Sequence, residues 1–246
     1  MKRWAALGAL SLATGLLSAC DPAEHPAACG EDRGFVTWAW GSVPANTTNT
    51  SQMSHRNVRA WTMVVGKDSF PADPDQFGHA AQQAALRWTL KTNGCGISDT
   101  ANLAITTVVA GAGYQGAAPR ADNVNVFDAA PIADPAVGGF TQIYGYTTAP
   151  HNGASPHYVI SEADVRIDCC DGVNWGPRGS NQLLKNLEDI SLHELGHTMG
   201  LGHVGLPGGN LAMGYNYVQD MIGWGDIAGM NCLYPVTVGT PGNRCG

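Results

Sequence analysis

One stretch of the chain, residues 193–203, constrains the chemistry of this protein more than any other. His193 and His197 are four residues apart, so on a helix their side chains project from the same face. Imidazoles at this spacing can bind one zinc ion, and Glu194 lies beside them, where it can reach a water on the metal without binding the metal itself. The pattern predicts a zinc site on a helix, with Glu194 as the general base.

Gly200 and His203 extend this pattern beyond the helix. Gly200 favours the left-handed backbone conformation that ends helices, because glycine has no side chain to clash there. The chain can then turn back and present His203 as a third ligand, which an uninterrupted helix would not do. Three protein ligands leave a position open for water, as in catalytic zinc sites, whereas structural sites are usually closed by four. We therefore expect a catalytic Zn²⁺ on His193, His197 and His203.

The run His193-Glu194-x-x-His197-x-x-Gly200-x-x-His203 resembles the zinc motif of the metzincin clan of endopeptidases. The resemblance implies a methionine beneath the metal in a tight Met-turn, and Met213 stands downstream in a suitable place. Within the clan the chain is most similar to the matrixins, including bacterial matrixin-like proteins, over residues 35–234. The fold class that this implies is α+β: a twisted five-stranded mixed sheet, three main helices and the Met-turn.

Two positions depart from the matrixin pattern. Matrixins tend to carry serine after the third histidine, where this chain has Val204. The residues Met213-x-Tyr215 are more like astacins and serralysins, in which the tyrosine can stabilise the transition state. That likeness implies an oxyanion-stabilising role for Tyr215. Packing beside the turn is the alternative for this ring, and Tyr217 is a rival for the same role.

The first 19 residues resemble a bacterial lipoprotein signal peptide. Lys2 and Arg3 supply positive charge, and residues 4–17 form an apolar stretch too short to span a membrane. The sequence Leu17-Ser18-Ala19-Cys20 resembles a lipobox, which implies lipidation of Cys20. An ordinary signal peptide is the alternative. Either way, we expect an extracytoplasmic protein of the bacterial cell envelope, lipid-anchored or secreted.

The rest of the chain is expected to hold one folded domain. Residues 20–34 would tether it to the membrane, residues 35–235 would form the protease domain, and residues 236–246 a tail with Cys245. Hydrophobic residues make up 44% and charged residues only 13%, which is typical of a globular domain. The net charge of −7, without a basic cluster, argues against nucleic acid as a partner. We expect a monomer whose partners are protein or peptide substrates.

Cysteines and aspartates give weaker indications. Six cysteines remain after Cys20, and an even number in an exported chain predicts disulfide bonds. Cys169 and Cys170 are expected to pair with different partners, because a ring between neighbours is strained. Matrixins often carry Ca²⁺, but the aspartates of this chain are scattered, so calcium is compatible with the sequence and its ligands cannot be assigned.

Hydrophobic patterning predicts the elements around the zinc motif. Residues 43–69 give no clear pattern. By the resemblance, residues 141–148 form the edge strand along the cleft, where an extended peptide can add as a further strand. Strands are expected at residues 35–40, 103–109, 123–127, 141–148 and 163–168, and helices at about 73–93, 181–200 and 218–233.

We therefore expect a zinc-dependent endopeptidase that hydrolyses peptide bonds of extracytoplasmic proteins by a metal-activated water, with Glu194 as general base. The alternative is an inactive, surface-anchored binding lipoprotein that keeps the protease fold. The presence of Glu194 favours the enzyme, because a binding protein needs no base.

Overall fold

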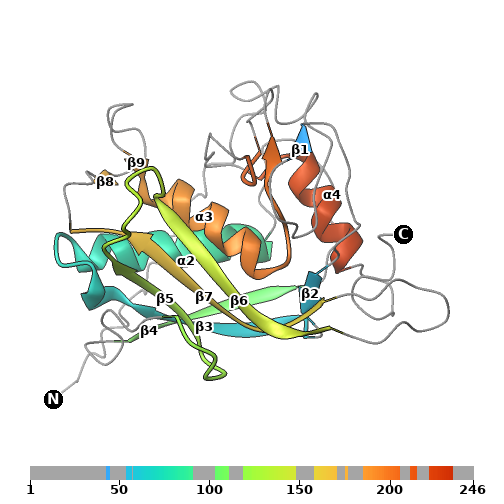
Figure 1. The fold of residues 1–246 in the computed structure, drawn as a ribbon, viewed down its shortest axis with the longest axis horizontal. Helices are drawn as coiled ribbons and strands as arrows, with labels where there is room; N and C mark the ends of the chain where they lie inside the picture. Colours follow the sequence, from blue (N-terminus) through green and yellow to red (C-terminus); the bar gives the residue numbers. More distant parts are fainter. Residues whose placement is uncertain are drawn as a thin grey trace, which may run out of the picture.

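The computed structural model describes residues 43–44, 54–56, 58–90, 103–110, 119–147, 158–170, 175–176, 185–205, 211–214 and 222–234. Over these residues the architecture is α+β, with a mixed sheet and helices packed on it (Figure 1). The expected signal peptide with Cys20, the tether, the strand at 35–40, Tyr215, Tyr217 and the tail with Cys245 lie outside the described residues. No described helix is long and apolar enough to cross a membrane.

Five long strands form the sheet in the order β4-β3-β5-β7-β6. Four of them pair in parallel, and only β6 at the edge runs antiparallel to its neighbour β7. A sixth, three-residue strand, β2 (Ser54–Arg56), pairs in parallel with the start of β7. The expected mixed sheet is thus confirmed. The long strands are β3 (Ala60–Gly66), β4 (Ala104–Ala110), β5 (Asn125–Ala130), β6 (Gly139–Thr147) and β7 (Tyr158–Asp168).

The strand that sequence patterning missed, β3, lies in the middle of the sheet. Trp61, Met63 and Val65 are buried on the helix side, and Thr62 between the first two is exposed. Val64 lies on the same face as Thr62 but is apolar, so the alternation of apolar and polar residues that marks a strand is weak in this sequence. The sequence also placed the start of β7 too late: this strand begins at Tyr158 rather than at residue 163.

Three helices of ten or more residues occur in the described part of the chain, as expected. The start of α2 (Pro74–Leu90) is as predicted, because Asp73 Oδ1 accepts a hydrogen bond from Gln76 N at 3.0 Å. The other two helices begin later than the sequence suggested. Zinc-motif helix α3 spans Leu187–Thr198, because the preceding residues Lys185–Asn186 form strand β9, paired with β8 (Trp175–Gly176). The last helix, α4, spans Trp224–Leu233.

The main hydrophobic core lies between one face of the sheet and helices α2 and α3 (Figure 1). Phe127 and Val165 of the sheet belong to the same buried cluster as Trp88 of α2 and Leu195 of α3. Trp88 also donates its indole N–H to the carbonyl of Leu192 at 2.8 Å, which ties α2 to the zinc-motif helix. Because α3 is packed on both the sheet and α2, its side chains have a fixed direction relative to the edge strand β6.

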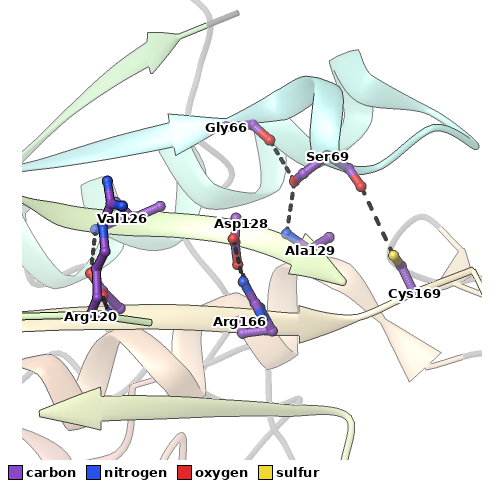
Figure 2. A network of polar contacts seen from close by, with 9 residues as sticks. Gly66, Ser69, Arg120, Val126, Asp128, Ala129, Arg166 and Cys169 are labelled. Atoms are coloured by element: carbon purple, nitrogen blue, oxygen red, sulfur yellow. Dashed lines mark hydrogen bonds and ion pairs between the residues drawn. The ribbon is translucent and has the colours of Figure 1, made fainter. Parts of the chain in front are cut away.

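Polar contacts join β5 to β7 and to the segment that follows β3 (Figure 2). Arg166 of β7 forms a two-pronged ion pair with Asp128 of β5, at 2.7 and 3.0 Å. Burial raises the pKa of Asp128, and Arg166 opposes this shift. In the 3₁₀ helix η1 (Lys67–Ser69), the Ser69 hydroxyl donates to the Gly66 carbonyl at 2.6 Å and accepts from Ala129 N at 2.8 Å. Asp128 and Arg166 are partners in the register of β5 and β7, so their ion pair reinforces that register.

The sequence-based expectation for the adjacent cysteines was wrong. Cys169 and Cys170 form a disulfide bond with each other at the end of β7. Cys170 adopts a left-handed φ of 75°, and this backbone conformation accompanies the bond between the two neighbouring cysteines. Cys169 is buried, with its sulfur 4.0 Å from the Ser69 carbonyl oxygen (Figure 2). Cys232 of α4 is also disulfide-bonded, in accord with the expected oxidised cysteines.

A buried arginine and a buried tyrosine hold the C-terminal end of α3. Arg56 Nε donates to the Thr198 carbonyl at 2.9 Å, and its Nη2 donates to Asn125 Oδ1 at 2.8 Å. The Tyr234 hydroxyl accepts from Arg56 N at 3.0 Å and donates to the Met199 carbonyl at 2.7 Å. Burial raises the pKa of Tyr234 to about 12, so this hydroxyl keeps its proton. The carbonyl groups of Thr198 and Met199 are therefore held in place where the turn after α3 begins.

Tyr234→Phe is expected to lower the free energy of unfolding by about 1–3 kcal/mol, because the buried amide of Arg56 and the carbonyl of Met199 each lose this hydroxyl. Urea unfolding followed by circular dichroism measures the loss. Tyr146→Phe is the control, since Tyr146 is 53% exposed, and its change should stay within about 0.5 kcal/mol. Equal losses in the two variants would contradict the role given to Tyr234.

Candidate metal centre

The end of α3 directs the chain back toward the helix, as Gly200 predicts. Gly200 has a φ of 100°, in the left-handed region. Its N–H donates to the His197 carbonyl at 2.9 Å, and Leu201 N donates to the Gly196 carbonyl at 3.3 Å. This pair of bonds is a Schellman motif, which ends the helix and satisfies two of its last carbonyls. The reversal brings His203 beside the face of α3 that carries His193 and His197.

The three predicted ligands converge. Nε2 of His203 lies 3.0 Å from Nε2 of His193 and 3.0 Å from Nε2 of His197. Within the described ranges, this is the one group of three histidine, cysteine or acidic residues whose ligand atoms could share a metal ion. His193 and His197 are buried, and His203 is partly exposed, so of the three ligands His203 is the one that solvent reaches.

Hydrogen bonds at the far ring nitrogens fix the chemical form of two ligands. Nδ1 of His193 lies 2.7 Å from the Ala212 carbonyl oxygen, and Nδ1 of His197 lies 2.8 Å from that of Leu201. A carbonyl oxygen only accepts, so each Nδ1 carries the proton, and in a neutral ring Nε2 then has a lone pair. Burial, together with the nearby His203, lowers the pKa of His193 to about 3, which favours the neutral ring.

The same reasoning applies to the other two rings. Burial lowers the pKa of His197 well below its usual value and also lowers the pKa of His203. Lone pairs of His193 and His197 therefore point at a common position beside His203 Nε2. A cation placed between lone pairs gathered in this way is attracted to all of them. The donor set thus fits a divalent metal ion held by His193, His197 and His203.

Glu194 is buried against the edge strand β6. The Thr141 hydroxyl lies 2.8 Å from Glu194 Oε2 and 2.9 Å from the Glu194 carbonyl oxygen. Burial raises the pKa of Glu194 to about 8, and the hydrogen bond from Thr141 opposes that shift. A Cβ atom at Gly139 would lie 3.2 Å from Glu194 Cγ, so the absence of a side chain at Gly139 leaves space for the Glu194 side chain. A lone threonine in a strand carries no functional signal, so the contact of Thr141 with Glu194 could not be predicted from the sequence.

Met213 lies against the zinc-motif helix. Residues 211–214 form a turn closed by a hydrogen bond from Gly214 N to the Leu211 carbonyl at 3.0 Å. A Cβ atom at Gly196 would lie 2.2 Å from Met213 Sδ, so only glycine at that position admits the methionine. Val204 N donates to the Met213 carbonyl at 2.8 Å, which joins the strand after His203 to the turn. Val204 thus has a backbone role and a buried side chain.

A residue that sequence reasoning missed, Asp226 of α4, anchors this turn. Its Oδ2 accepts hydrogen bonds from Ala212 N at 2.8 Å and from Gly223 N at 2.9 Å, and its Oδ1 accepts from Met213 N at 3.2 Å. Asp226 is 1% exposed. Its sequence signal is its place as the third residue of α4, after the capping residue Gly223. Hydrophobic patterning predicts a start near residue 218 instead, which would put Asp226 in the middle of the helix.

Five of the six aspartates between residues 122 and 171 lie in the described part of the chain, and each has a hydrogen-bond partner. Asp128 pairs with Arg166, and the described remainder accept hydrogen bonds from backbone N–H groups. Burial, which outweighs these hydrogen bonds, raises the pKa of Asp164 to about 6. No cation site is assigned to them. They are Asp122 to Val124 N, Asp134 to Ala136 N, Asp164 to Arg120 N and Val126 N, and Asp168 to Ile132 N; Asp171 lies outside the described residues.

Comparison with known proteins leaves the site to be judged by its own geometry. No protein-family model matches the chain, and no curated protein matches it.

The raised pKa of Glu194 predicts how the stability of the metal-free protein depends on pH. The folded-state pKa of about 8 lies above the ordinary value of 4.5, so the folded state binds the extra proton. Its contribution is complete below pH 4.5 and is lost as the pH rises through 8. Between pH 6.5 and 8 the free energy of unfolding should therefore change by about 2 kcal/mol less favourably in wild type than in Glu194→Gln, in which the histidines contribute equally. Urea unfolding of the two metal-free proteins measures this, and the same pH dependence in both would contradict it.

Gly196→Ala is expected to lower the free energy of unfolding by about 1–3 kcal/mol, because the new methyl group overlaps Met213 Sδ. Gly78→Ala in α2 is the matched control, since its Cβ would meet its nearest neighbour at an ordinary 3.6 Å. A helical glycine-to-alanine change without a clash stabilises by about 0.5–1 kcal/mol. Chemical denaturation of both variants provides the comparison, and stabilisation by Gly196→Ala would rule out the packing described.

Proposed function

We propose that this protein is a metzincin-type, matrixin-like zinc endopeptidase that hydrolyses peptide bonds of extracytoplasmic proteins. The observation that carries the proposal is the convergence of three imidazole Nε2 atoms on one position, with Glu194 next to the first ligand in the sequence. Met213 packed under Gly196 supports its assignment as the Met-turn methionine. The lipid anchor on Cys20, the envelope location and the role of Tyr215 are parts of the proposal that rest on the sequence alone.

Zinc is the metal proposed for this site. Bound to three nitrogens at its usual bond length, a tetrahedral Zn²⁺ keeps the nitrogens about 3.3 Å apart, which is close to the 3.0 Å between His203 Nε2 and each of the other two. When bound, zinc would supply Lewis acidity, lowering the pKa of water and polarising a carbonyl group. The ligands are neutral, so they leave the full charge of the ion available for this chemistry.

Glu194 is the group of this chain that would move the proton. A cation at the three histidines would favour its carboxylate form, because an opposite charge nearby lowers the pKa of an acid. The carboxylate would then take a proton from the attacking water and deliver it to the leaving amine. Thr141, hydrogen-bonded to Glu194 Oε2, would hold the carboxyl group beside β6 while it does so.

The edge strand β6 is proposed as the place where substrate binds. Among the described strands it pairs only with β7, and it lies beside α3, the helix that carries His193 and His197 (Figure 1). An extended peptide could add to its free edge through backbone hydrogen bonds, which suits an enzyme that acts on peptide chains. Thr141 is both part of this strand and in contact with Glu194, so a peptide bound there would lie next to the base.

Glu194→Gln in the zinc-loaded protein is expected to lower the rate of casein or peptide-library cleavage by at least about 100-fold, because the base is lost. The zinc content, measured by elemental analysis, should remain at one ion per chain. Glu188→Gln is the control: Glu188 is also on α3 but pairs with Arg87 at 3.0 Å, so cleavage should continue.

The outcomes separate the enzyme from its alternative. Zinc-loaded Glu194→Gln that cleaves as fast as wild type would refute the role of Glu194. Wild type that holds zinc yet cleaves no peptide in the library would instead support a binding lipoprotein with a protease fold.

A further inference from the structure

We infer that Asp226 is a positioning residue that strengthens the hydrogen bond of His193 through the peptide group between Ala212 and Met213. The inference rests on the proposed function, because it treats His193 as a metal ligand. It gives α4, which contributes no ligand, a direct connection to the metal centre.

The connection is a continuous chain of hydrogen bonds through one peptide group. The N–H of this group, on Met213, donates to Asp226 Oδ1 at 3.2 Å. Its carbonyl oxygen, on Ala212, lies 2.7 Å from Nδ1 of His193. Asp226, Ala212, Met213 and His193 are each at most 4% exposed. Water therefore competes little for any of these bonds.

A negative charge at one end of a peptide group alters the other end. A carboxylate that accepts from the N–H polarises the group and increases the negative charge on its carbonyl oxygen. In a buried chain of hydrogen bonds such polarisation strengthens each bond, by roughly 10–30%. The Ala212 carbonyl becomes a better acceptor for the Nδ1–H of His193, and Nε2 of the same ring becomes a stronger ligand.

The two carboxylate oxygens of Asp226 have different hydrogen-bond partners. Oδ2 holds Ala212 N and Gly223 N, and so fixes the turn to the start of α4. Oδ1 alone contacts the peptide group that holds His193.

His197 provides an internal reference. Its Nδ1 is held by a separate bond, 2.8 Å to the Leu201 carbonyl in the turn after α3. A relay through Asp226 must act on His193 more than on His197. A general loosening of the fold would act on both rings.

Asp226→Asn tests the relay. The amide keeps one oxygen, which is best placed at the Oδ2 position because that site accepts two N–H groups. Its NH₂ group then faces Met213 N, so the bond to the peptide group and the charge are both lost. The measurement is proton NMR of the full chain with ¹⁵N-labelled histidine, following the Nδ1–H signals of both rings, first metal-free and then with Zn²⁺.

In Asp226→Asn, the Nδ1–H signal of His193 is expected to move upfield while that of His197 stays in place. Zinc affinity, measured by competition with a chelator, should fall roughly two- to fivefold, because only the polarisation of the bond to His193 is lost and not the bond itself. Asp128→Asn is the matched control, since it neutralises a buried carboxylate that is bonded to Arg166 instead. It should leave both histidine signals and the zinc affinity unchanged.

Unmoved signals, or equal shifts of His193 and His197, would overturn the relay. If wild type binds no zinc, the proposed function fails, yet the metal-free spectra still test the relay. If Asp226→Asn does not fold, wild type decides: a scalar coupling across the hydrogen bond must link Met213 N to the Asp226 carboxyl carbon, and its absence refutes the inference.

Discussion

The hydrogen bonds from His193 and His197 to backbone carbonyls are the constraint on which the site depends. Each bond places a proton on Nδ1, so the lone pair of Nε2 must face inward. Neither ring can relieve the crowding by charging, because burial lowers the pKa of both. The fold thus holds the Nε2 atoms in a position to bind a cation. The carbonyl groups that orient the two rings, those of Leu201 and Ala212, belong to two separate turns after α3.

The rest of the structure keeps those two turns in place. The Schellman motif at Gly200 sets the first turn, and Arg56 and Tyr234 bind the helix end just before it. Asp226 at the start of α4 sets the second turn, and Met213 within it fills the space that Gly196 leaves. Helix packing on the sheet then aligns this assembly with β6, whose Thr141 contacts Glu194. Hydrogen bonds and packing contacts thus connect the sheet, α3 and α4 with the residues of the metal centre.

Sequence patterning went furthest where chemistry is local. The spacing of the histidines and the glycine at position 200 predicted both the converging rings and the reversal of the chain, because helix periodicity and a left-handed φ determine them. It failed where partners are distant. Strand β3 has apolar residues on both faces, so its position in the sheet decides its burial. Asp226 and Thr141 contact residues that are distant in the sequence. The Cys169–Cys170 bond occurs with a left-handed backbone conformation at Cys170, which no pattern in the sequence predicts.

We propose that three neutral imidazoles hold a zinc ion and leave a position open to water. X-ray absorption spectroscopy of the zinc-loaded protein measures the ligands of the ion directly. We expect three imidazole nitrogens and one further light atom at about 2.0–2.1 Å, with no sulfur. Zinc bound with a sulfur ligand at about 2.3 Å, or held by four protein ligands, would contradict it.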